Sequence, residues 1–143
     1  MTFSQLNSFI CCSHYYSEYD YFIFLNDSVR GPFLPYWYPD KDWTKIYTSH
    51  LTDELKLFGS TINFYKGNVH ITSCIFATDK IGLELLIKNN IFTRKHLKKK
   101  PRYSCEIRQS RLMLDNGYNI GCLMEAYKHV DFRKYRNKQY ADD

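Results

Sequence analysis

Apolar residues recur along this chain in short runs that polar turns separate. The first run, residues 19–25, is aromatic and β-branched and ends in the polar turn Asn-Asp-Ser at residues 26–28, which is typical of a buried strand. Residues 55–64 and 69–76 are two further strand candidates, and the Tyr-Lys-Gly-Asn turn between them predicts a hairpin. We expect these three strands to share one sheet, with residues 26–28 at its edge facing a cleft.

Two helices are predicted in the second half of the chain. Asp79 is placed to cap the first, which runs to about residue 89. Ser104 is placed to cap the second, which reaches about residue 115 before Gly117 supplies a left-handed stop. The first helix carries an apolar stripe at helical spacing, formed by Ile81, Leu85 and Leu86. Strands and helices in this mixture indicate an α/β fold, with a mixed sheet and flanking helices.

The rest of the chain divides into a loop, a strand and a tail. Residues 31–43 hold three of the four prolines and both tryptophans, so we expect a loop packed by its own aromatic side chains. Residues 118–124 are predicted to form a last short strand. Beyond Glu125 the chain is polar and basic, and we expect a partly disordered tail.

The composition is that of a chain that folds. Hydrophobic residues make up 44% and charged residues 24% of the 143, which is close to the averages for soluble globular proteins and does not suggest disorder. No apolar run approaches the roughly 20 residues needed to cross a bilayer. Aromatic residues reach 17%, with 13 tyrosines. Because tyrosine offers a flat apolar face and a polar tip, this enrichment favours polar, ring-shaped ligands such as sugars or bases.

Charge and cysteine content narrow the function only slightly. The net charge of +5 comes largely from residues 94–102 and 133–138, and such clusters attract anions without distinguishing among them. We interpret both clusters as solvated surface segments. The five cysteines are an odd number without a Cys-x-x-Cys pair, so neither a zinc module nor a full set of disulfides is indicated.

The turn that follows the first strand carries candidate chemistry. Two carboxylates at the end of a hydrophobic strand can hold a divalent cation against a diphosphate. Here Asp27 is a single carboxylate, and the planar guanidinium of Arg30 could bind phosphate oxygens directly. From these residues alone, an Asx-turn that ends the strand is the favoured interpretation.

Five sequence segments between residues 19 and 127 favour a ligand-binding role for this turn over a simple Asx-turn, because they resemble segments of a known family in the same order. Residues 19–35, Y-D-Y-F-I-F-L-N-D-S-V-R-G-P-F-L-P, resemble a segment of a family of glycosyltransferases found in polysaccharide-synthesis contexts, where F-L-N-S-S-V-R-G-P-F-L-P recurs. The later blocks are W-T-K-I-Y at 43–47, L-K-L-F-G-S-T-I at 55–62, F-A-T-D-K-I-G-L at 76–83, and C-E-I with Ser110 followed by L-D-N-G-Y-N-I at 114–120.

The resemblance implies the A-type fold of nucleotide-diphospho-sugar transferases, of which residues 19–127 would be the acceptor-side, catalytic half. The implied activity is transfer of a sugar from a nucleotide diphosphate to a glycan hydroxyl. Residues 1–18 are divergent and do not resemble the nucleotide-binding half that precedes this half in such enzymes, and residues 128–143 form the basic tail. We therefore expect a shortened domain without turnover, with at most millimolar donor affinity, and with an apolar sheet face that a partner chain covers.

The same resemblance assigns roles to individual residues. Glu106, in the family's late E-I segment, is the candidate catalytic base, because inverting transfer needs a carboxylate to take the proton of the attacking hydroxyl. Without the resemblance, Glu106 is a first-turn helix glutamate that complements the helix dipole. A manganese or magnesium ion would bind at Asp27. The implied donor-binding residues are Asn26, Asp27, Ser28, Arg30 and His70, the last matching a histidine of the family's P-H-V-Q-S segment.

Three other functions remain open. The first is a domain that binds carbohydrate or a partner without catalysis. The second is a two-histidine phosphoesterase, because His50-Leu51-Thr52 and His70-Ile71-Thr72 both fit the H-x-T pattern, although a separation of 20 residues leaves no room for the intervening half of such enzymes. The third is a small basic protein that binds anions through Lys98-Lys99-Lys100. No aromatic residues interleave with these lysines, which does not favour nucleic acid as a partner.

Overall fold

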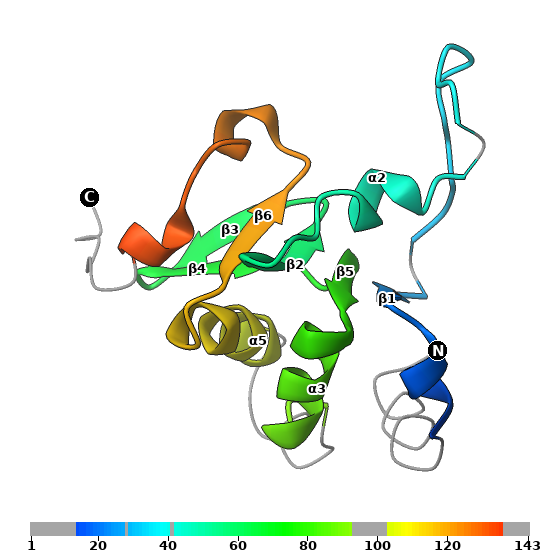
Figure 1. The fold of residues 1–143 in the computed structure, drawn as a ribbon. Coiled ribbons are helices and arrows are strands. Elements are labelled where there is room, and N and C mark those ends of the chain that lie inside the picture. Colours follow the sequence, from blue (N-terminus) through cyan, green and yellow to red (C-terminus); the bar gives the residue numbers. More distant parts are fainter. Residues whose placement is uncertain (1–13, 28, 41, 93–102, 136–143) are drawn as a thin grey trace.

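The computed structural model describes residues 14–27, 29–40, 42–92 and 103–135. It confirms an α/β fold in which helices flank a mixed sheet (Figure 1). The strands are β1 (Tyr21–Leu25), β2 (Leu55–Gly59), β3 (Ile62–Tyr65), β4 (Asn68–Ile71), β5 (Ile75–Asp79) and β6 (Asn119–Cys122). The α-helices are α2 (Lys45–Thr48), α3 (Lys80–Lys88) and α5 (Tyr103–Asp115), and the short 3-10 helices are η1 (His14–Glu18), η2 (Glu125–Tyr127) and η3 (Phe132–Tyr135). None of the helices in these ranges has the length and apolar character needed to span a membrane.

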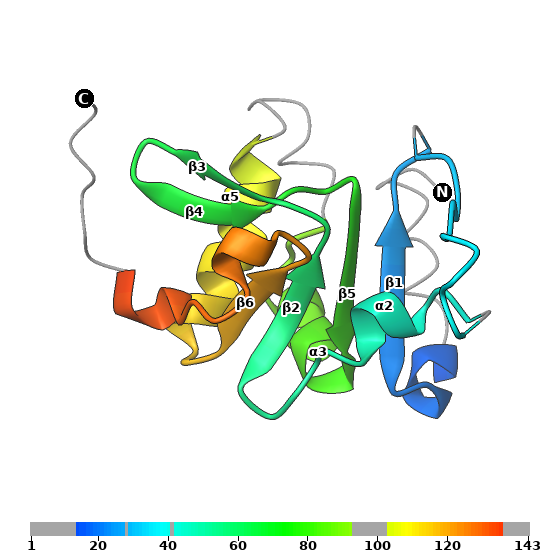
Figure 2. The same ribbon diagram turned by 90° about the horizontal axis from the view of Figure 1, so that it is seen from above.

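The main sheet has four strands in the order β1-β5-β2-β6. Strand β5 is antiparallel to both β1 and β2, whereas β6 is parallel to β2. Strands β1, β2 and β6 therefore run in the same direction, which Figure 2 shows most clearly for β1 and β2. The expected strands within residues 19–25 and 118–124 are confirmed as β1 and β6.

Both long strands expected at 55–64 and 69–76 are broken in two. The parts farther from the hairpin turn, β2 and β5, belong to the main sheet. The parts next to the turn, β3 and β4, pair in a separate two-stranded sheet. The expectation that residues 69–76 lie wholly in the main sheet is therefore wrong. The bend follows Gly59, where an added Cβ would lie 2.3 Å from Cγ2 of Ile71, so the two strands cross more closely there than a side chain would allow.

The hairpin itself is confirmed. Lys66 and Gly67 both have positive φ angles, of 48° and 72°, as a two-residue type I′ turn requires. The side-chain amide of Asn68 donates a hydrogen bond of 2.9 Å to the backbone carbonyl of Lys66.

Both faces of the main sheet are covered. Consecutive residues of β2 and β5 are buried, as in strands that have packing on both sides. On one face, α3 and α5 pack over Leu57 and Phe76. On the other, Tyr47 of α2 packs against Phe58 and Ala77. The expectation of a bare apolar face for a partner chain is therefore wrong for these two strands.

Helix α3 begins as predicted. The Asp79 side chain accepts a hydrogen bond of 2.9 Å from the amide of Gly82, and its other oxygen is 2.5 Å from Nζ of Lys56, a buried lysine. The predicted apolar stripe is only partly correct, because Leu86 is buried whereas Ile81 is exposed. Gly82 and Leu83 take the place of Ile81 on the buried side.

Helix α5 begins earlier than predicted and ends where expected. It already includes Tyr103, so Ser104 lies inside the helix and not at its cap. Gly117 has a φ of +83°, which is the left-handed conformation expected of the stop residue.

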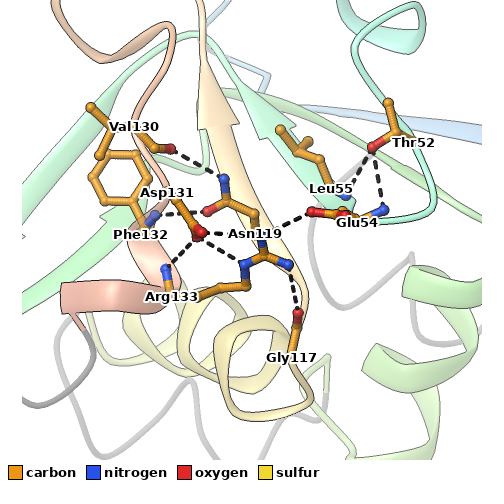
Figure 3. A network of polar contacts seen from close by, with 9 residues as sticks. All are labelled: Thr52, Glu54, Leu55, Gly117, Asn119, Val130, Asp131, Phe132 and Arg133. Carbon is orange, nitrogen blue, oxygen red and sulfur yellow. Dashed lines mark hydrogen bonds and ion pairs between the residues drawn. The ribbon is translucent and has the colours of Figure 1, made fainter.

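The segment after β6 folds back onto the sheet, as Figure 3 shows. Phe132 is buried, and its amide donates to Oδ1 of Asn119 at 2.9 Å. Arg133 then joins two carboxylates: its Nε is 2.8 Å from Oδ1 of Asp131, and one of its terminal nitrogens is 2.9 Å from Oε2 of Glu54. Residues 128–135, which the sequence pattern places in the basic tail, thus belong to the fold. Residues 136–143 lie outside the described ranges.

The proline-rich loop does not pack on its own aromatic residues as expected. Phe33, Tyr36 and Trp37 have exposed fractions of 85%, 100% and 68%. Trp43 is the exception at the end of this stretch, and it makes an edge-to-face contact with Tyr47 in the core.

Candidate functional site at the carboxyl edge of the sheet

The ends of three parallel strands meet at one edge of the main sheet. Strands β1, β2 and β6 end there, and the antiparallel strand β5 begins there. We call this region, formed by residues 26–27, 29–30, 60–61, 72–74 and 122–124, the carboxyl edge. In open α/β sheets, ligands bind outside the carboxyl ends of the strands. The carboxyl edge is therefore the candidate functional site.

The polar turn predicted from the sequence lies at this edge. The amide of Asn26 donates to the carbonyl of Cys74 at 2.9 Å, and the amide of Val29 donates to the carbonyl of Asn26 at 3.1 Å. The first bond holds the turn against the start of β5, and the second lies within the turn. Asp27 and Arg30 are exposed there and can reach a ligand from solvent. Ser28 lies outside the described residues.

Glu106 lies behind the edge, on the first turn of α5. Its Oε1 accepts two hydrogen bonds from Ser73, one from the amide at 2.8 Å and one from the hydroxyl at 2.5 Å. Its Oε2 is 3.7 Å from Nε2 of His70, whose side chain is fully buried on β4. Glu106 itself is only 9% exposed. The carboxylate thus anchors the segment that joins β4 to β5.

The predicted site residues are connected through that segment. Ser73 binds Glu106 and its neighbour Cys74 binds Asn26. The structure therefore bonds the start of α5 and the turn after β1 to two consecutive residues. Asp27 and Arg30 face solvent, whereas Glu106 and His70 do not, and the catalytic and binding roles of all these residues stay predictions.

The sequence pattern did not predict two pairs of hydroxyl groups at the carboxyl edge. The Ser60 hydroxyl lies 2.8 Å from the hydroxyl of Tyr47, and the hydroxyls of Thr61 and Thr72 are 2.6 Å apart. A signal for the second pair existed, because Thr61 and Thr72 are equally far from the predicted hairpin turn, and the register of β3 and β4 continued outward places them opposite each other.

The cysteines near the edge differ in their surroundings. Cys122, at the end of β6, is buried, and this burial raises the pKa of its thiol. The thiolate, and not the thiol, is the nucleophilic form of cysteine, so the surroundings of Cys122 do not favour it as a nucleophile. Cys74 has an exposed thiol, and it, Cys105 and Cys122 are free cysteines.

A divalent cation held by the protein alone does not fit this edge. Metal sites in proteins need several oxygen, nitrogen or sulfur ligands. The described residues contain no group of three or more His, Cys, Asp or Glu that could hold a metal ion. At the turn, Asp27 is the one carboxylate.

The two histidines of the H-x-T pattern lie in different kinds of structure. His70 is on β4, whereas His50 lies in a turn after α2 and stacks on Phe58 with ring centroids 4.2 Å apart. Burial lowers the pKa of His50, and the charge of Lys128 lowers it further. Because His50 is not on a strand, the geometry does not favour a two-histidine phosphoesterase. Lys98, Lys99 and Lys100 lie outside the described residues.

We compared the chain with known proteins and found no relative. No family model, no curated protein and no solved structure matches the chain.

Proposed function

We propose that this chain is a glycosyltransferase-like domain of the A-type fold, which binds a nucleotide-diphospho-sugar weakly at the carboxyl edge, the site from which such domains transfer the sugar to a glycan hydroxyl. The observation that carries the proposal is the Glu106-Ser73-Cys74-Asn26 connection. It joins two of the blocks that resemble the transferase family, although they are far apart in the sequence. That convergence is what a shared binding site requires.

In this proposal the turn after β1 binds the diphosphate. Arg30 is exposed, and its guanidinium offers several donors to phosphate oxygens. Asp27 is the exposed acceptor of the same turn and can accept hydrogen bonds from sugar hydroxyls. If a manganese or magnesium ion takes part, the diphosphate must supply most of its ligands, because Asp27 is the one carboxylate at the turn.

In this proposal Glu106 has two tasks, as a general base and as a positioning residue. A general base must come within about 3 Å of the proton that it removes. Its Oε1 is held by Ser73, so Oε2, which faces His70, is the oxygen left for that task. In the described arrangement Glu106 is first of all a positioning residue for the edge.

The direct test is isothermal titration with uridine, guanosine and thymidine diphosphate sugars in the presence of manganese. We expect a dissociation constant of about 1 mM for the preferred donor, equivalent to about 4 kcal/mol. Arg30→Gln should weaken binding by about tenfold or more, because a hydrogen bond to a charged group contributes about 1.5–3 kcal/mol. Arg111→Gln, at an exposed arginine of α5, is the matched control. Binding that Arg30→Gln leaves unchanged would contradict the proposed donor site.

A second candidate is carbohydrate binding without transfer. It is favoured by the exposed rings of Phe33, Tyr36 and Trp37, since aromatic faces stack on the apolar faces of sugars. Titration with oligosaccharides alone, followed by tryptophan fluorescence, distinguishes the two functions. A fluorescence change that Trp37→Ala abolishes, with no donor binding, would favour this second candidate.

A further inference from the structure

The outer edge of β1 has backbone groups that point away from the sheet. Strand β1 is the first strand of the main sheet and pairs only with β5 among the described strands. The hydrogen bonds from the Asn26 amide to Cys74 and from the Lys80 amide to Asp20 fix which residues of β1 bond to β5. Because bonding alternates in antiparallel pairs, the N–H and C=O groups of Tyr21, Ile23 and Leu25 point outward. Within the described part of the chain, no backbone hydrogen bond outside the β1–β5 pair reaches these three residues.

Strand β4 of the hairpin, in contrast to β1, is hydrogen-bonded by side chains of a neighbouring helix. There α5 supplies side chains along the strand: the Ser110 hydroxyl accepts from the Ile71 amide at 2.9 Å, and Arg111 donates to the Asn68 side chain at 3.1 Å. Native proteins protect sheet edges in such ways, or with charges and prolines within the strand. Strand β1, Tyr-Phe-Ile-Phe-Leu, contains neither.

The side chains of β1 extend both sheet faces to this edge. Phe22 and Phe24 pack on the face covered by α3 and α5, and Ile23 packs on the face covered by α2. Tyr21 and Leu25, on either side of Ile23, remain 50% and 45% exposed. A strand added at this edge would cover both of them.

We propose that β1 pairs in antiparallel fashion with β1 of a second copy of this chain, about a two-fold axis at Ile23. Ile23 then faces Ile23 of the second copy, and Tyr21 faces Leu25. These three outward-facing residues form three pairs that each exchange two hydrogen bonds, and the two main sheets become one continuous sheet. A two-fold axis closes the assembly at a dimer.

The charges around β1 favour a second copy over a charged peptide. The strand itself carries no charge. In the proposed register, Asp20 lies opposite Asn26 of the second copy and Asp27 lies opposite Tyr19, so the acidic residues next to the strand meet neutral side chains. Like charges directly opposite each other destabilise a strand pair, and this register contains none within these pairs. The interface is small, so the dimer is weak and depends on concentration.

Paired charge variants test the register. The variant Tyr21→Lys/Leu25→Lys places lysine opposite lysine in its own dimer, and Tyr21→Glu/Leu25→Glu places glutamate opposite glutamate. Each alone should dimerise at least about tenfold more weakly than the natural chain, measured by sedimentation equilibrium. An equimolar mixture should restore the dimer, because lysine then faces glutamate in both contacts. Both residues are exposed, and circular dichroism confirms that each variant is folded.

The matched control is Phe64→Lys, which adds charge at an exposed apolar residue of β3, in the separate two-stranded sheet. It should leave the mass distribution unchanged. A natural chain that stays monomeric at millimolar concentration would overturn the proposal, as would assemblies larger than dimers. So would a mixture of the two variants that fails to dimerise although both are folded.

Discussion

Glu106 of α5 accepts two hydrogen bonds from Ser73 through a single carboxylate oxygen, at 2.8 Å from the amide and 2.5 Å from the hydroxyl. These bonds fix the segment between β4 and β5. The residue after Ser73 in this segment is Cys74, whose carbonyl accepts a hydrogen bond from the backbone amide of Asn26. The residue predicted to be the base therefore also sets the position of the strand-end turn.

We expect Glu106→Ala to lower the free energy of unfolding by about 2–4 kcal/mol, because it leaves the Ser73 amide without its charged acceptor. Ser73→Ala keeps the amide bond and should cost about 1–2 kcal/mol, since it removes one bond to a charged group. Urea denaturation measures both. Glu84→Ala, at an exposed glutamate of α3, is the control. If Glu106→Ala costs no more than the control, Glu106 does not anchor this segment.

The ion pair between the buried Lys56 and the partly buried Asp79 should be sensitive to the loss of either charge. Asp79→Asn keeps an acceptor for the Gly82 amide but leaves Lys56 without its counter-charge. Removing one partner of a buried ion pair costs about 3–5 kcal/mol, whereas replacing both is often close to neutral. The double variant Lys56→Met/Asp79→Asn should therefore be more stable than Asp79→Asn alone, as measured by thermal or urea unfolding. Equal stabilities would show that the charges are not coupled.

Gly82→Ala should destabilise the protein although Gly82 lies in a helix. In an exposed helix, alanine is favoured over glycine by about 1 kcal/mol. Here the added Cβ would lie 2.8 Å from the backbone oxygen of Lys56 and 2.1 Å from the hydroxyl oxygen of Thr78. Overpacking of this kind costs about 1–3 kcal/mol. A rise in the midpoint of urea unfolding would show that α3 can move away from β2.

The contacts of Asp131 should make stability depend on pH. The hydrogen bond from Arg133 is the main cause that lowers the pKa of Asp131 below its ordinary value. A carboxylate with a lowered folded pKa contributes stability above the unfolded pKa of about 3.9 and loses it as the pH falls through the folded pKa. Asp131→Asn should thus be less stable than the natural chain at pH 6, and the difference should shrink toward pH 2. Urea unfolding at both pH values measures it, and a constant difference would contradict this account.

Local sequence determined the type of most elements. The aromatic run before Asn26 predicted β1, the Gly67 turn predicted the hairpin, and Asp79 and Gly117 marked a helix start and a helix stop. These features depend on side-chain periodicity and on backbone conformations that a few neighbouring residues impose. The location of the polar turn at a strand end also followed from the sequence.

Tertiary structure decided how those elements meet. No local pattern showed that the hairpin would bend after Gly59, because the bend depends on the close approach of Ile71. Nor could it show that Phe132 would be buried, because that requires Asn119 to hold the segment after β6. The site followed the same division: the resemblance to the transferase family singled out Glu106, but its burial and its bonds to Ser73 depend on how α5 docks on β4. Docking depends on packing between residues far apart in the chain, and periodicity within one element does not specify it.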